Sequence, residues 1–145
     1  MALTSSYGFV NTSNTVDGQL IQGLWDGDDA ISIAPMADKG TMLIGADGSA
    51  LFSVSANKAA TITIRLQHTS PTHRLLMQKL KRQQALASAA TAFPVTAFDT
   101  SSGEGGTADK CFIQSAPTDT KGTNATVREW VLVTGELVSE IPNAS

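Results

Sequence analysis

The stretch that most constrains the fold is TITIRLQHTSPTHRLL, residues 61–76, where a strand pattern changes to a helix pattern at one proline. Apolar and polar residues alternate over 60–68, as they do in a strand with one buried face. Ser70 is a good helix N-cap, and Pro71 suits the first helical position. Because strong helix formers follow, the sequence predicts one long helix at about residues 71–90, beside a half-buried strand.

Short apolar runs broken by turn residues make up much of the remaining chain, which is typical of strands. An Asp-Gly step at residues 47–48 favours the positive φ angles of a tight hairpin turn between two of these runs. The glycine-rich segment at 100–109 predicts a flexible loop, and Gly135 predicts a bulge in the last strand. The strands are expected at residues 19–24, 31–36, 41–46, 50–55, 60–68, 93–99, 110–116 and 126–140, with a further one near 7–11.

This order of elements predicts a mainly β protein, a β-sandwich or split barrel with one flanking α-helix at about residues 71–90. The 145 residues suit a single domain spanning residues 1–145. In the alternating strand, Ile62, Ile64 and Leu66 are expected to pack toward the helix. The opposite face then carries Thr61, Thr63, Arg65 and Gln67.

Positive charge is concentrated where the strand meets the helix. The basic residues of segment 65–82 are Arg65, Arg74, Lys79, Lys81 and Arg82, with no acidic residue among them, although the chain has a formal net charge of −3. Nucleic-acid binding is disfavoured, because the net charge is negative and no Phe, Tyr or Trp side chain lies between residues 68 and 92 to stack on bases. A solvated helix face and a protein-binding face both remain open.

The sequence offers no set of residues for catalysis or metal binding. His68 and His73 are the only histidines, and no nucleophile-elbow pattern accompanies them. With the lone Cys111 they form no closely spaced ligand set, and the acidic cluster at 26–29 lacks the downstream glutamate of a calcium loop. No run approaches the roughly 18 apolar residues of a membrane helix. We therefore expect a protein that is not an enzyme, needs no cofactor and does not enter a membrane.

Three motifs within residues 21–80 resemble the tail tube proteins of contractile-tailed bacteriophages. The first is G-x-x-D-G-D-D-x-I-x-I, which starts at Gly23, and the second is the hairpin GADG at 45–48. The third is the strand T-I-T-I-x-L-x-x-T-S-P, which ends at Pro71 and leads into the helix. The order and spacing of the three motifs carry the resemblance, which extends to the related inner tubes of pyocins and type VI secretion.

The resemblance implies a structural virion protein, the subunit of a phage tail's inner tube. Such subunits form homo-hexameric rings that stack helically into a hollow tube, and inner strands from six subunits join into one continuous β-barrel around the lumen. A contractile sheath surrounds the tube, and the phage genome passes through it without specific binding. The implied partners are thus further copies of the chain, the tail sheath protein, baseplate and tail terminator proteins, and DNA in transit. The implied location is the virion tail, after assembly in the host bacterial cytoplasm.

The resemblance also assigns roles to three sets of residues. The polar strand face, Thr61, Thr63, Arg65 and Gln67, is expected to line the lumen or lie close to it. The basic helix face, Arg74, Lys79, Lys81 and Arg82, is expected on the outside of the tube against an acidic sheath surface. The candidate inter-ring loop is Pro35, Met36, Ala37, Asp38, Lys39 and Gly40.

A second function class shares the strand-rich pattern. A carbohydrate- or ligand-binding β-sandwich module of a fibre or adhesin would show similar strands. Such a module usually presents aromatic side chains in its loops, whereas the two long polar loops here, at 100–109 and 117–124, contain none. The tube subunit is therefore the preferred hypothesis, and the binding module is the alternative.

Overall fold

The computed structural model describes residue 2 and residues 4–140, and it is mainly β with one long helix, as predicted. Most strands belong to one curved antiparallel sheet, and β4 with β5 forms a separate hairpin. In sheet order the strands are β2 (Gln19–Leu20), β1 (Thr12–Val16), β7 (Phe93–Asp99), β8 (Gly105–Ser115), β9 (Val127–Thr134), β6 (Ala60–Gln67) and β3 (Ile31–Pro35), with β10 (Val138–Glu140) paired to β8. The remaining elements are β4 (Gly40–Ile44), β5 (Ala50–Val54), α1 (Thr72–Leu86) and the short 3₁₀ helices η1 (Phe9–Asn11) and η2 (Ala89–Thr91).

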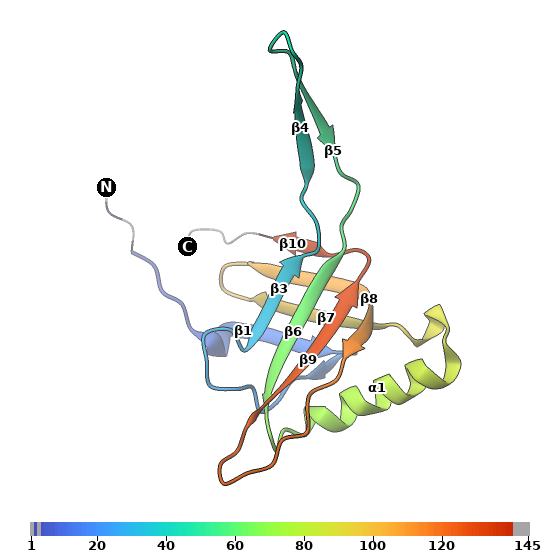
Figure 1. Cartoon of the computed structure of the whole chain (residues 1–145). Coiled ribbons are helices and arrows are strands. Elements are labelled where there is room, and N and C mark those ends of the chain that lie inside the picture. Colours follow the sequence, from blue (N-terminus) through green and yellow to red (C-terminus); the bar gives the residue numbers. More distant parts are fainter. Residues whose placement is uncertain (1, 3, 141–145) are drawn as a thin grey trace.

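The sheet curls so that β9, β6 and β3 lie in front of β8, β7 and β1, and α1 lies across one end (Figure 1). β3 and β2 are the two edges of the sheet, and within the described residues no strand joins them. The barrel is therefore split along one side. This is the architecture that the sequence predicted.

β6 shows why the sequence signal was clear. Its burial alternates residue by residue, and Ile62, Ile64 and Leu66 are at most 1% exposed. They belong to one core cluster with Leu76 of α1 and Leu132 of β9. Each such side chain contributes roughly 1.5–3 kcal/mol of stability when fully buried. The helix and the strand are thus held together by the face that the alternation predicted.

α1 begins and ends close to the predicted positions. The Ser70 hydroxyl accepts a hydrogen bond from the Thr72 N–H at 3.2 Å and donates one to the Gln22 carbonyl. The helix ends at Leu86, before the predicted residue 90, because Ala87 adopts a left-handed conformation with φ of 44°. In the described part of the chain, no helix is both long and apolar enough to cross a membrane.

Several strand boundaries differ from the prediction because pairing partners set them. β8 begins at Gly105, inside the predicted glycine-rich loop, since residues 105–107 pair with both β7 and β10. The predicted strand near 7–11 is instead η1, and β1 follows it. The long final strand is interrupted around Gly135 and becomes β9 and β10.

Cys111 lies in the core with no exposed surface, and burial raises the pKa of its thiol to about 11. At pH 8 about one thiol in a thousand is therefore ionised, and the thiolate is the reactive form. We expect the native protein to resist the thiol reagent DTNB at pH 8, and to react once per chain after unfolding in urea. Glutathione in the same buffer serves as the control for reagent activity. Complete labelling of native protein as fast as glutathione would contradict the buried position.

Candidate functional site

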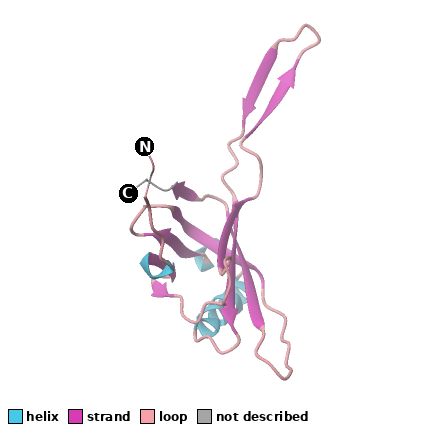
Figure 2. Cartoon of the chain, turned by 90° about the vertical axis from the view of Figure 1, so that its left-hand side faces the viewer, coloured by secondary structure: helices cyan, strands magenta, loops and turns pink. Residues whose placement is uncertain are grey.

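The hairpin of β4 and β5 projects away from the body of the protein (Figures 1 and 2). Its turn is well defined: the Gly45 N–H donates to the Ser49 carbonyl at 2.7 Å, and Gly48 has φ of 89°. The Asp47 carboxylate accepts the Ser49 N–H at 3.0 Å, and this hydrogen bond lowers the pKa of Asp47. The Asp-Gly turn predicted from the sequence is confirmed.

The projecting hairpin is apolar and uncovered. Its register sets Met42 opposite Phe52 on one face and Leu43 opposite Leu51 on the other. Asp47 is the only charged residue among residues 40–54. The large apolar side chains, 51–81% exposed, are Met42, Leu43, Ile44, Leu51, Phe52 and Val54. Continuous exposed apolar surface of this kind marks a site of association.

The candidate inter-ring loop forms the base of this hairpin. Pro35 ends β3 and Gly40 begins β4, so residues 36–39 connect the body to the projection. The Met36 N–H donates to the Ala59 carbonyl at 3.0 Å, which ties the two connecting segments together. The sequence predicted only this connector as a contact segment, whereas the exposed apolar surface is formed by the strands beyond it. The signal was available, because both strands are apolar on both faces and almost free of charge.

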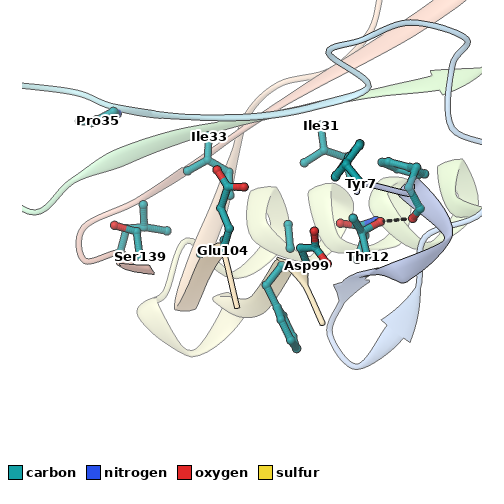
Figure 3. Close-up of a pocket in the computed structure, with 15 residues that line it drawn as sticks. Tyr7, Thr12, Ile31, Ile33, Pro35, Asp99, Glu104 and Ser139 are labelled. Atoms are coloured by element: carbon teal, nitrogen blue, oxygen red, sulfur yellow. Dashed lines mark hydrogen bonds between the residues drawn. The ribbon is translucent and has the colours of Figure 1, made fainter. Parts of the chain in front are cut away.

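A hollow of about 380 Å³ opens at the split side of the barrel, between β3 and the strands β1, β7 and β8. Ile31 and Ile33 point into it from β3, with Asp99 and Glu104 on the opposite side (Figure 3). The Ser101 hydroxyl donates to Asp99 Oδ1 at 2.8 Å, which lowers the pKa of that carboxyl. β3 therefore presents an unpaired edge beside a partly apolar hollow, an arrangement that invites another chain.

The polar face of β6 lies where the alternation placed it. Thr61, Thr63 and Arg65 are half-buried, and Gln67 is exposed. Arg65 sits between two carboxylates, 3.2 Å from Glu129 on β9 and 3.4 Å from Asp29. Its positive charge is thereby matched. The structure brings these residues together on one face of the front layer.

The basic helix face is smaller than predicted. Arg74, Lys81 and Arg82 are exposed, but Lys79 turns toward the body. Its Nζ pairs with the Asp17 carboxylate at 2.5 Å and lies 5.8 Å from the centre of the Phe93 ring. The reason is helical geometry, because Lys79 follows the buried Leu76 by three residues and so shares its side of the helix. Lys79 therefore does not lie with the other three.

A second hollow, of about 710 Å³, lies beside α1 and was not foreseen from the sequence. Arg74, Met77, Gln78 and Lys81 of the helix line one side, and residues 117–119 line the other. The buried Arg128 holds that segment: it donates to the Thr118 carbonyl at 2.7 Å and to the Thr120 carbonyl at 2.7 Å. We name this hollow the α1 cleft.

The acidic cluster at 26–29 lies beside β6, where Asp29 pairs with Arg65. Among the described residues, no group of three or more histidine, cysteine, aspartate or glutamate side chains is placed to hold a metal ion. Asp29 binds Arg65 a second time, because its backbone carbonyl accepts a hydrogen bond from Arg65 Nη1 at 2.7 Å. The cluster is part of the structural neighbourhood of β6.

A family model described as the bacteriophage PhiTE tail tube protein matches residues 4–141. The chain belongs to this tail tube protein family. The resemblance inferred from residues 21–80 is therefore confirmed, and it extends through residues 91–125. Membership places the chain among the structural tail components of phage-like particles. No curated protein matches the sequence of this tail tube protein.

Solved structures share the fold of the tail tube protein at low sequence identity. The anti-feeding prophage cap, described as the AFP tube terminating cap, has a TM-score of 0.66 and 10% identity, over 97% of this chain and 94% of that one. The PVC sheath/tube terminator of an extracellular contractile injection system has a TM-score of 0.64 and 13% identity, over 97% and 100% of the two chains. A chain of the PVC sheath-tube complex has a TM-score of 0.62 and 12% identity, over 93% and 91%. These likenesses support the β-rich tail tube fold.

Proposed function

We propose that this tail tube protein is the structural, non-enzymatic subunit of a phage tail's inner tube, with residues 1–145 as one tail-tube domain. Hexameric rings of the subunit stack helically into a hollow tube inside a contractile sheath, and the genome passes through the lumen during ejection. Baseplate and terminator proteins bind the two ends. Assembly takes place in the host bacterial cytoplasm.

The hairpin of β4 and β5 is the observation that carries this proposal. Its side chains are apolar on both faces, so a hairpin left in water exposes them all. Fully burying one such side chain is worth roughly 1.5–3 kcal/mol, which makes association with another chain strongly favourable. We assign the partner to a second copy in the next ring, because the hairpin projects away from the body of the subunit (Figure 2).

The open edge of β3 supports ring closure. An unpaired edge strand exposes backbone donors and acceptors, and a closed ring of subunits removes such edges. Front strands of six copies would then continue into one barrel around the lumen. The face bearing Thr61, Thr63, Arg65 and Gln67 lies on that front layer and lines the lumen or lies close to it. The pairing of Arg65 with Glu129 supports this placement, because an arginine in an ion pair attracts the phosphates of passing DNA less than an unpaired arginine does.

The exposed basic residues of α1 support an external contact. Arg74, Lys81 and Arg82 face solvent on the helix, away from the core side. They suit an acidic surface of the sheath protein. Lys79 is omitted from this contact because Asp17 already pairs with it.

Electron microscopy of the purified protein tests the proposal. Negatively stained samples over a range of concentrations should contain six-fold rings or tubes, and a reconstruction should place the polar face of β6 toward the lumen. Compact monomers at every concentration would contradict the proposal and favour a ligand-binding β-sandwich module. A reconstruction with this face on the outer surface would contradict the lumenal assignment alone.

A further inference from the structure

We propose that the α1 cleft is a docking site for an acidic segment of a partner protein, in which a carboxylate lies next to an apolar side chain. The inference deepens the proposed function and rests on it for the identity of the partner, because it narrows the external contact of the tube to one cleft. The recognition chemistry itself comes from the residues of the cleft.

Two cations on one side of the cleft supply the attraction for a carboxylate. Arg74, Met77, Gln78 and Lys81 follow the i, i+3, i+4, i+7 pattern and therefore share one face of α1. Arg74 and Lys81 are about 10 Å apart along the helix axis, from the rise of 1.5 Å per residue. Both are exposed, and neither takes part in an ion pair among the residues that the structure describes. Their charges are available to a partner.

Apolar surface between the two cations suits the neighbouring side chain. Met77 is 40% exposed although it lies in the middle of the helix, and Pro117 also lines the cleft. Methionine adapts its shape to different apolar partners, which is useful at a binding surface. A segment that offers a carboxylate and an apolar group together matches this alternation of charge and apolar surface.

The wall of the cleft is fixed before any partner arrives. His73 Nδ1 accepts the Trp130 indole N–H at 3.0 Å, and Nε2 lies 2.8 Å from the Gln67 carbonyl. Both ring nitrogens are thus occupied within the protein. Together with the hold of Arg128 on residues 118–120, this arrangement lowers the entropy lost on binding.

The same features favour a protein segment over nucleic acid. Trp130 is only 1% exposed, so its large indole face is not offered for a base to stack on. The exposed Asp119 carboxylate also lines the cleft, but it lies 3.3 Å from Lys121 and 3.5 Å from Arg128, so it adds only a weak repulsion toward the evenly spaced phosphates of a strand. Carboxylates placed on the helix side, against Arg74 and Lys81, avoid that repulsion.

Fluorescence anisotropy with a defined probe tests the site. The probe is a fluorescein-labelled peptide with two glutamates flanking a phenylalanine, titrated with the full chain at low salt. We expect Arg74→Glu and Lys81→Glu each to weaken binding about tenfold or more, since each removes an attraction and adds a repulsion. Lys81→Gln should weaken it less, in the same direction. Lys110→Glu is the matched control: it makes the same charge change at an exposed residue of β8 outside the cleft, and it should leave the affinity within about twofold.

Several results would overturn the inference. The first is no binding of the peptide, and the second is equal binding of a peptide with glutamines in place of the glutamates. The others are an equal effect of Lys110→Glu, and equally tight binding of an oligonucleotide of the same charge. Ring and tube formation, scored separately by electron microscopy, distinguishes this failure from that of the proposed function. If the protein forms tubes but does not bind the peptide, the docking proposal for the α1 cleft fails and the tube proposal stands. If the protein stays monomeric but binds the peptide, the tube proposal fails and the docking proposal stands.

Discussion

Replacing Met42 and Phe52 together by aspartate should abolish stacking of the protein into tubes while leaving each subunit folded. The two residues face each other on one side of the projecting hairpin, and both are more than half exposed in the subunit. Losing the burial of two such side chains costs roughly 3 kcal/mol or more per contact, which is about a 100-fold weaker association. Because every subunit in a ring carries the change, the loss is multiplied around the ring.

Sedimentation velocity and negative-stain electron microscopy measure this effect directly. The matched control is Thr123→Asp, which adds a carboxylate at an exposed loop residue outside the hairpin and should leave tubes unchanged. Far-UV circular dichroism should show the same secondary-structure content for all variants, because the hairpin adds nothing to the buried core. Tubes of normal length from the double aspartate variant would refute the role of the hairpin.

Gly105→Ala should destabilise the subunit by about 3–5 kcal/mol, the sum of a strained backbone and an overpacked contact. Gly105 starts β8 opposite Phe98 of β7 and has φ of 148°. A methyl group there would collide with the Ala97 carbonyl and with the Cα of Phe98. Backbone cannot move aside as a flexible side chain can, so the pairing of β7 with β8 must shift.

Gly103→Ala is the internal comparison for this effect. Gly103 lies in the same turn with φ of 80°, but nothing lies within 4 Å of an added Cβ. It should therefore cost only about 1 kcal/mol, from conformational strain alone. Urea unfolding of both variants, in the double aspartate background so that association does not contribute, gives the comparison. Similar midpoints for the two variants would show that the collision is absorbed and that strain alone matters.

The elements that could be predicted from the sequence are those whose signals are local. The alternation of β6, the Ser-Pro start of α1 and the Asp-Gly turn each depend on residues within one short window. β1 was missed because its residues, Thr12–Val16, are mostly polar and form a strand only by pairing with β7. The start of β8 was missed for a similar reason, since glycines normally indicate a loop until two partner strands hold them.

The candidate surfaces also divide into those with a local sequence signal and those that depend on residues distant in the sequence. Helical spacing predicted that Arg74, Lys81 and Arg82 would be exposed, and the same spacing could have shown that Lys79 lies on the side of Leu76. The α1 cleft could not be predicted. Its far wall is residues 117–119, and their position depends on Arg128, whose hydrogen bonds span eight to ten residues of sequence.

The hairpin of β4 and β5 leaves the body at one pole only (Figures 1 and 2). A polymer joined through it is therefore directional, since a projection and the surface that receives it are different parts of the molecule. One end of the polymer exposes the apolar hairpins, and the other end exposes the surfaces that would receive them. The protein that starts such a polymer and the protein that stops it must therefore differ. One must bind the exposed hairpins, and the other must fill the receiving surface.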